Sequence, residues 1–128
     1  MKATELRIGN LIQDTRHPER NCTVFRLTNG NDFNITHQYD KSKELSYTNE
    51  NCDALKPISL TEEWLVKFEW EIMKGENYYF LDNNYFSINP NGQLYYMNDY
   101  TAVDIKYVHQ LQNLYFALTG EELTPNPQ

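Results

Sequence analysis

The sequence predicts an α+β fold in which antiparallel β meanders are closed by a helix near the end of the chain. Short β-rich runs separated by turn residues occur in both halves of the sequence, and a strong helical pattern covers residues 107–119. A length of 128 residues with 40% hydrophobic residues indicates one globular domain, residues 1–128, with its own core.

The first 39 residues contain three β-rich runs and predict a three-stranded N-terminal meander. Leu6–Ile12 is the first run, and Gly9 within it indicates a bulge or a close backbone approach. Cys22–Leu27 and Asp32–Tyr39 are the next two, and Asn29–Gly30 between them is a strong hairpin signal.

Residues 40–56 are polar and lack periodicity, so we expect a long loop with at most a short irregular strand around Leu45 and Tyr47. Loops of this length in compact domains are commonly either contact regions or mobile segments, and the composition is compatible with both.

The pattern over residues 57–68 predicts a short helix. Thr61 is the preferred N-cap because it places Glu62 and Glu63 in the first turn, where the helix dipole favours acids. Ser59 is the alternative, since it would form a capping box with Glu62. The side chains expected to face the core are Trp64, Leu65 and Phe68.

Residues 69–106 predict a second meander of about five strands. The runs are Trp70–Met73, Tyr78–Leu81, Tyr85–Ile88, Gln93–Met97 and Ala102–Ile105. Successive side chains of a strand point to opposite faces, which places one set on the inward face: Tyr79, Leu81, Phe86, Ile88, Val103 and Ile105. The opposite face would carry Tyr78, Phe80, Tyr85 and Tyr95. This tyrosine-rich face is either a protein-binding patch or the second buried side of a curled sheet.

The helix over residues 107–119 is expected to close the domain, with Gly120 left-handed at its end and Leu123 as a closing contact. One arc is apolar and would pack on the sheet: Tyr107, Val108, Leu111, Leu114, Tyr115 and Leu118. The opposite arc carries His109, Gln110, Gln112, Asn113 and Phe116.

Phe116 on this polar arc has two interpretations. If the helix lies on one sheet, the arc faces away from the core, and Phe116 is an interface anchor with a polar rim. If the 40–56 segment or the first meander covers the arc, Phe116 is buried within the monomer. The candidate partner-binding residues are therefore His109, Gln112, Asn113 and Phe116 of the helix, with Tyr78, Tyr85 and Tyr95 of the sheet.

The sequence contains no catalytic, metal-binding or cofactor motif, so we expect neither an enzyme nor a cofactor. Cys22 and Cys52 lack the spacing of a zinc site and are expected to be free thiols. A zinc site would have to recruit histidines from separate elements, and His37 is expected to be a hydrogen-bonded, half-buried side chain. The three histidines are His17, His37 and His109.

The net charge is −7 and is uneven. Residues 1–64 hold ten acids and eight bases, giving −2, whereas residues 65–128 hold eight acids and three bases, giving −5. Such a charge disfavours direct binding to nucleic acid and favours a partner with a basic surface.

We expect no membrane segment and a cytoplasmic location, because the sequence has neither a long apolar run nor a secretory signal.

Three blocks resemble a family of small uncharacterised proteins from phages, prophages and other mobile elements. They are Glu5–Leu11, Pro57–Phe68 and Tyr107–Leu123, the last reading YVHQLQNLYFALTGEEL. The family carries glycine where this chain has Glu69, and a left-handed Glu69 would cost about 1 kcal/mol. No activity or site residue transfers with this resemblance.

The resemblance implies a non-enzymatic module in the bacterial cytoplasm that binds a host or phage protein. An inhibitor of a host defence protein, such as a nucleic-acid-binding nuclease, is one such module, which makes the chain an anti-CRISPR candidate. The alternatives are a small-molecule or nucleotide-binding protein, which would use an aromatic pocket in the sheet, and a virion or assembly component. The end of the chain, residues 124–128, is expected to be disordered.

Overall fold

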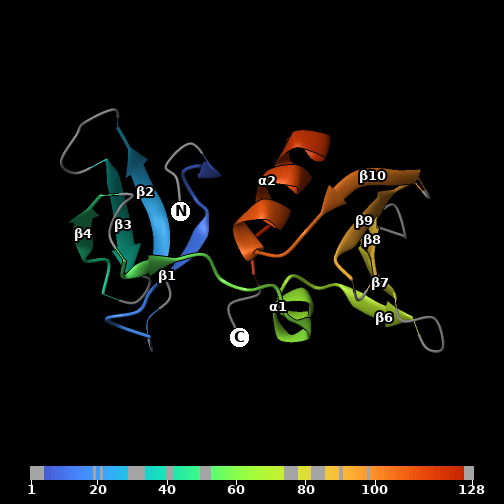
Figure 1. Ribbon diagram of the computed structural model, residues 1–128, viewed down its shortest axis with the longest axis horizontal. Helices are drawn as coiled ribbons and strands as arrows, with labels where there is room; N and C mark the ends of the chain where they lie inside the picture. The colour runs from blue at the N-terminus through green and yellow to red at the C-terminus, as the bar shows by residue number, and fades with distance from the viewer. Residues whose placement is uncertain are drawn as a thin grey trace.

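The structure is a computed structural model, and it describes residues 5–18, 20, 22–28, 34–39, 42–49, 53–73, 78–81, 86–89, 91–97 and 99–125. Two antiparallel sheets lie at opposite ends of the molecule, and a helix near the end of the chain stands between them (Figure 1). The predicted α+β class is therefore confirmed.

The first sheet has five strands in the order β4-β3-β2-β1-β5. Its strands are β1 (Leu11–Asp14), β2 (Cys22–Leu27), β3 (Ile35–Tyr39), β4 (Leu45–Thr48) and β5 (Leu55–Lys56). The short strand expected around Leu45 and Tyr47 is present as β4, whereas the rest of the predicted 40–56 loop also supplies β5, which was not predicted. β4 pairs with β3, and β5 pairs with β1, so partners elsewhere in the chain give a polar segment its strand conformation.

The chain before β1 makes a turn within the first predicted strand, Leu6–Ile12, in which Gly9 was expected to mark an interruption. Gly9 has a φ of 97°, and its N–H donates to the carbonyl of Val24 at 2.8 Å. The Asn10 side chain accepts from the backbone N–H of Arg7 at 2.7 Å, which holds the turn. The close backbone approach predicted at Gly9 is therefore confirmed, but the strand starts only at Leu11.

Helix α1 (Glu62–Lys67) begins at Thr61, whose hydroxyl oxygen accepts from the backbone N–H of Trp64 at 3.4 Å. The preferred N-cap is thus confirmed. At the other end, Glu69 has a φ of 67°. Its N–H donates to Val66, and the N–H of Trp70 donates to Leu65, a pair of bonds that typifies a Schellman ending. The left-handed position expected to suit glycine therefore holds a glutamate.

The second sheet is a five-stranded meander in the order β10-β9-β8-β7-β6, as predicted. Its strands are β6 (Glu71–Met73), β7 (Tyr78–Leu81), β8 (Phe86–Ile88), β9 (Gln93–Tyr96) and β10 (Asp99–Asp104). Phe86, Ile88 and Ile105 are buried as expected, whereas Val103 is 37% exposed. The inward assignment of Val103 is wrong because the register of β10 shifts between Tyr100 and Asp104. The side chains of Tyr79, Phe80 and Leu81 lie outside the described residues.

Helix α2 (Val108–Thr119) ends at Gly120, which has a φ of 75° and donates its N–H to the carbonyl of Phe116. The predicted bounds and left-handed ending are confirmed, and Leu123 is buried. Leu111 is buried and Leu114 packs partly buried against the same core, but Leu118 is exposed, contrary to the predicted arc.

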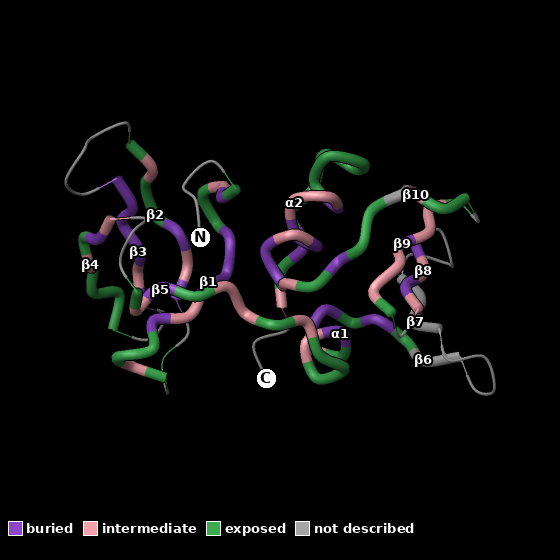
Figure 2. Tube along the Cα trace, in the orientation of Figure 1, coloured by how far each residue is buried: buried purple, intermediate pink, exposed green. Residues whose placement is uncertain are grey.

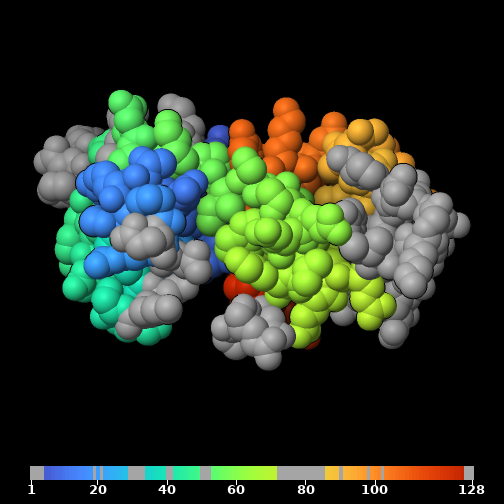
Figure 3. Space-filling view, turned by 90° about the horizontal axis from the view of Figure 1, so that it is seen from below, coloured from blue at the N-terminus to red at the C-terminus, as the bar shows by residue number. Residues whose placement is uncertain are grey.

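The buried residues form two hydrophobic clusters (Figure 2). The first lies within the first sheet and comprises Leu6, Ile12, Cys22, Val24, Ile35, Tyr39 and Leu55. The second unites α1, α2 and the second sheet and comprises Leu11, Leu65, Phe68, Trp70, Phe86, Ile88, Leu94, Ile105, Val108, Leu111, Tyr115 and Leu123. Successive strand residues point to opposite faces, so Leu11 joins the second cluster and Ile12 joins the first. In the space-filling view, the first sheet and the segment carrying α1 occupy neighbouring regions of the surface (Figure 3).

Candidate binding groove beside the closing helix

The polar side of α2 contacts the first sheet through buried amides. Gln112 is 2% exposed. Its Oε1 accepts from the backbone N–H of Leu11 at 2.8 Å, and its Nε2 donates to the carbonyls of Gly9 and Leu123, both at 3.4 Å. A single side chain thus joins β1, the turn before it and the segment after α2.

Asn113 extends this contact one residue along the helix. Its Oδ1 accepts from Asn10 Nδ2 at 2.8 Å and from Arg7 Nε at 3.1 Å, and its Nδ2 donates to the carbonyl of Glu5 at 3.0 Å. We call this set of contacts the seam; its members are Glu5, Arg7, Gly9, Asn10, Leu11, Gln112, Asn113, Glu122 and Leu123. Of the two expected interpretations of the polar arc, the one in which the first meander covers it holds for Gln112 and Asn113, because both side chains are bonded to β1 and the chain before it.

Phe116 lies at the rim of the seam. It is 38% exposed, and the guanidinium carbon of Arg7 stands 4.2 Å from the centre of its ring. Arg7 also pairs with Glu122 at 2.8 Å. A cation on one ring face is a favourable arrangement, so Phe116 is neither a free anchor nor a core residue. The first meander covers it in part, which is closer to the second of the two expected interpretations.

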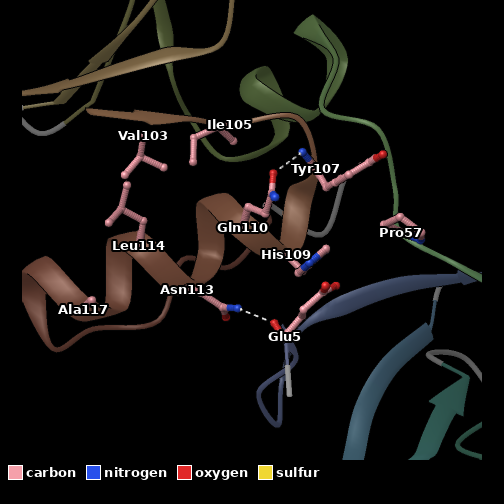
Figure 4. Close-up of a pocket in the computed structure, with 10 residues that line it drawn as sticks. All are labelled: Glu5, Pro57, Val103, Ile105, Tyr107, His109, Gln110, Asn113, Leu114 and Ala117. Atoms are coloured by element: carbon pink, nitrogen blue, oxygen red, sulfur yellow. Dashed lines mark hydrogen bonds between the residues drawn. The ribbon is translucent and has the colours of Figure 1, made fainter. Parts of the chain in front are cut away.

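On another side of α2, an open groove runs between the helix and β10 (Figure 4). Its volume is about 710 Å³. The lining residues are Glu5, Pro57, Val103, Ile105, Tyr107, His109, Gln110, Asn113, Leu114 and Ala117. They come from the start of the chain, the β5–α1 link, β10 and α2, so the groove lies where the two halves of the chain meet. Ligand sites favour such junctions.

His109 lines one end of the groove and is 3% exposed. Its ring stacks beside that of Tyr107, with centroids 6.0 Å apart and planes inclined by 10°. Burial lowers the pKa of His109, and the nearby Glu5 carboxylate offsets only part of that effect. The imidazole is therefore neutral at pH 7, with one nitrogen that can accept a hydrogen bond. Its buried Nδ1 has no hydrogen-bond partner within the described ranges.

The predicted helix residues therefore separate into two environments. The seam holds Gln112, Phe116 lies at the rim of the seam, His109 lines the groove, and Asn113 belongs to both. Sequence reasoning missed Val103, Leu114 and Ala117 as groove residues, because nothing in a local pattern shows that β10 and α2 stand apart at this point. It also missed Glu5, which lies about a hundred positions from the groove residues of β10 and α2.

The predicted tyrosine face lies only in part within the described residues, because Tyr85 and the side chain of Tyr78 are outside them. Tyr95 is half-buried, and its ring lies 5.5 Å from that of Tyr100, which is 45% exposed. The Tyr100 hydroxyl donates to Asp104 at 2.9 Å. The structure thus places Tyr95 beside Tyr100, which was not among the predicted partner-binding residues.

The first sheet encloses a polar cluster that sequence reasoning did not detect. Asp14 is fully buried and accepts from Arg16 Nε at 2.9 Å and from the Tyr39 hydroxyl at 2.8 Å. His37 Nε2 lies 3.2 Å from the same carboxylate. The bonds from Arg16 hold the pKa of Asp14 well below its usual range, whereas burial lowers the pKa of His37. His37 is hydrogen-bonded as expected, but it is fully rather than half buried.

Neither the groove nor this cluster resembles a metal site. Across the described parts of the chain, no three His, Cys, Asp or Glu side chains are placed to hold a metal ion. Cys22 is buried, and its Sγ lies 3.9 Å from the carbonyl oxygen of Arg20, whereas Cys52 lies outside the described residues.

Comparison with protein-family models, curated proteins and solved structures finds no match to this chain. None of the helices described here is both long and apolar enough to span a membrane.

Proposed function

We propose that the protein is a non-enzymatic protein-binding module, and that the groove between α2 and β10 holds an extended segment of its partner. The observation that carries this proposal is the groove itself, an open channel of about 710 Å³ beside the last strand of a sheet. The resemblance to mobile-element proteins agrees with it and makes a protein of the bacterial host the expected partner.

The position of β10 favours an extended occupant. β10 is an end strand in the order of its sheet, so one of its sides faces no further strand among the described elements. Such an edge can pair with an added peptide strand through main-chain hydrogen bonds. Side-chain pockets beside the edge then give specificity, and Val103, Leu114 and Ala117 supply apolar walls for one.

The charge of the chain favours a basic partner surface. The net charge is −7, and Asp99, Asp104 and Glu121 are exposed on β10 and just after α2. A nucleic-acid-binding host nuclease, whose surface must be basic, is the hypothesis that follows from this charge and from the resemblance.

A second candidate function, binding of a small organic molecule, is favoured by the size of the groove. Small-molecule sites usually enclose about 300–1,000 Å³ and combine apolar walls with a few polar groups. The groove has such a volume, with His109 and Glu5 at one end. The tyrosine-rich sheet is not needed for this alternative.

A peptide selection tests the main proposal. Peptides selected on the wild-type protein from a random display library should lose at least about tenfold in affinity for Leu114→Arg or Ala117→Arg, about 1.4 kcal/mol, because each arginine fills the groove. Val66→Arg is the matched control, since Val66 is 55% exposed on α1 and lies outside the groove. Circular dichroism would verify that each variant is folded.

Selected peptides that bind both groove variants as tightly as the wild type would contradict the proposal. Failure to enrich any peptide, together with a small molecule released from the purified protein in native mass spectrometry, would favour the second candidate.

A further inference from the structure

We infer that the partner segment carries a lysine or arginine at the His109 end of the groove and aliphatic side chains two and four residues away. This inference rests on the proposed function and names the chemistry of its ligand. It follows from the distribution of charge, aromatic rings and apolar walls along the groove.

One acidic side chain, Glu5, lies at the His109 end of the groove. Glu5 is the one residue with a formal charge among the ten that line the groove. The basic residues near this end are placed elsewhere: Arg7 pairs with Glu122 in the seam, and Lys106 lines a smaller pocket between α1 and β8. Figure 4 shows the Glu5 carboxylate turned toward His109 at this end. An ammonium or guanidinium group placed here would meet an acid at the groove surface.

The two stacked rings at this end also favour a cation. Lysine and arginine groups are attracted to an aromatic face within about 6 Å of its centre, and the Tyr107 ring lines the groove.

The far end of the groove is apolar. Figure 4 shows the side chains of Val103 on β10 and Leu114 on α2 facing one another across it. Ala117 continues this wall, and its small side chain leaves room for an aliphatic group. A charged residue at this end would lose hydration without gaining a partner from these three residues.

The helix fixes the spacing between the two ends. Leu114 lies five residues after His109, about 7.5 Å along the helix axis, and Ala117 lies eight residues after it, about 12 Å. In an extended peptide, residues i, i+2 and i+4 face the same side and stand about 6.6 and 13 Å from the first. The best match is therefore a basic residue followed on the same side by two aliphatic residues.

Four five-residue peptides test this pattern by titration into isotope-labelled full-length protein, followed by NMR. They are acetyl-Lys-Ser-Leu-Ser-Val-amide, the same sequence reversed, and both with glutamate replacing lysine. We expect one lysine peptide to shift the signals of His109, Leu114 and Ala117 and to bind about fivefold or more tightly than its glutamate counterpart. Glu5→Gln should reduce that preference, and Glu63→Gln, which changes an exposed acid on α1, should leave it unchanged.

Two results would overturn the inference. If lysine and glutamate peptides shift the groove signals with equal affinity, the charge preference fails while the groove remains a peptide site. If none of the four shifts the groove signals, the pattern is wrong. The peptide selection then decides separately whether the groove binds peptides at all.

Discussion

At the level of single residues, Gln112 and Asn113 explain how the two halves of the protein are held together. Both amides look like surface residues on a helical wheel, yet each satisfies partners from the start of the chain. Those partners, Leu11 and Asn10, lie 101 and 103 positions away in sequence. A wheel separates apolar from polar positions but carries no information about a polar face that another sheet covers.

Replacing Gln112 should therefore be costly. Gln112→Met keeps the approximate volume but leaves the buried N–H of Leu11 without an acceptor, and we expect a loss of about 1–3 kcal/mol in the free energy of unfolding. Urea denaturation monitored by fluorescence measures this loss. Asn91→Ala, at an exposed turn position, should stay within about 0.5 kcal/mol of the wild type. A Gln112→Met variant as stable as the wild type would show that the seam contributes little.

The buried titratable residues predict a loss of stability in acid. The folded-state pKa values of His37 and His109 lie below that of an exposed histidine, so the unfolded chain takes up protons first as the pH falls below about 6.5. Asp14 also has a lowered pKa in the folded state, and its stabilising contribution declines below about pH 4.

The urea midpoint should thus fall from pH 7 to pH 5 and fall again below about pH 4. His109→Gln should flatten the first decline, since it removes one of the two buried histidines. A midpoint that is constant between pH 7 and pH 5 would contradict this account.

At the level of elements, the two helices were predicted well because their signals are local. The N-cap at Thr61, the end of α2 at Gly120 and the bounds of α2 all depend on residues within a few positions. The turn residues between the strands of the 69–106 segment are also local signals, and they mark the second meander. β5 was missed, and β4 was expected only as a short irregular strand, because their pairing with β1 and β3, rather than their composition, makes them strands. The groove was missed for a similar reason, since it exists only between elements.

The end of α1 offers a stabilising substitution. Glu69 occupies a left-handed position, with a φ of 67°, at which glycine is unstrained. Glu69→Gly should raise the free energy of unfolding by about 1 kcal/mol, whereas Glu69→Ala should not, because alanine has the same Cβ clash. Thermal or urea unfolding of the two variants tests this difference. Equal stability of the glycine and alanine variants would mean that backbone strain at this residue is negligible.

At the level of the whole molecule, the negative net charge predicts that the protein does not bind nucleic acid. Three arginines that could meet phosphate are already paired with acids: Arg7 with Glu122, Arg16 with Asp14 and Arg20 with Glu44. With a net charge of −7, the isolated protein should show no measurable affinity for DNA or RNA at physiological salt. A gel shift with single-stranded RNA and duplex DNA tests this. Micromolar binding would contradict it and would require a local basic patch in the first third of the chain.

The seam also constrains when the protein can complete its fold during synthesis. It joins residues just before and within β1, the first strand, to α2, the last element of the chain. At about 5–20 residues per second, a ribosome needs about 5–20 s to add the hundred residues between Leu11 and Gln112. The first sheet can form early from residues 5–56, but the Leu11 side chain and its N–H stay exposed to water until α2 has emerged. A nascent chain stalled before Val108 would thus leave the apolar Leu11 side chain exposed, and the final helix would cover it once released.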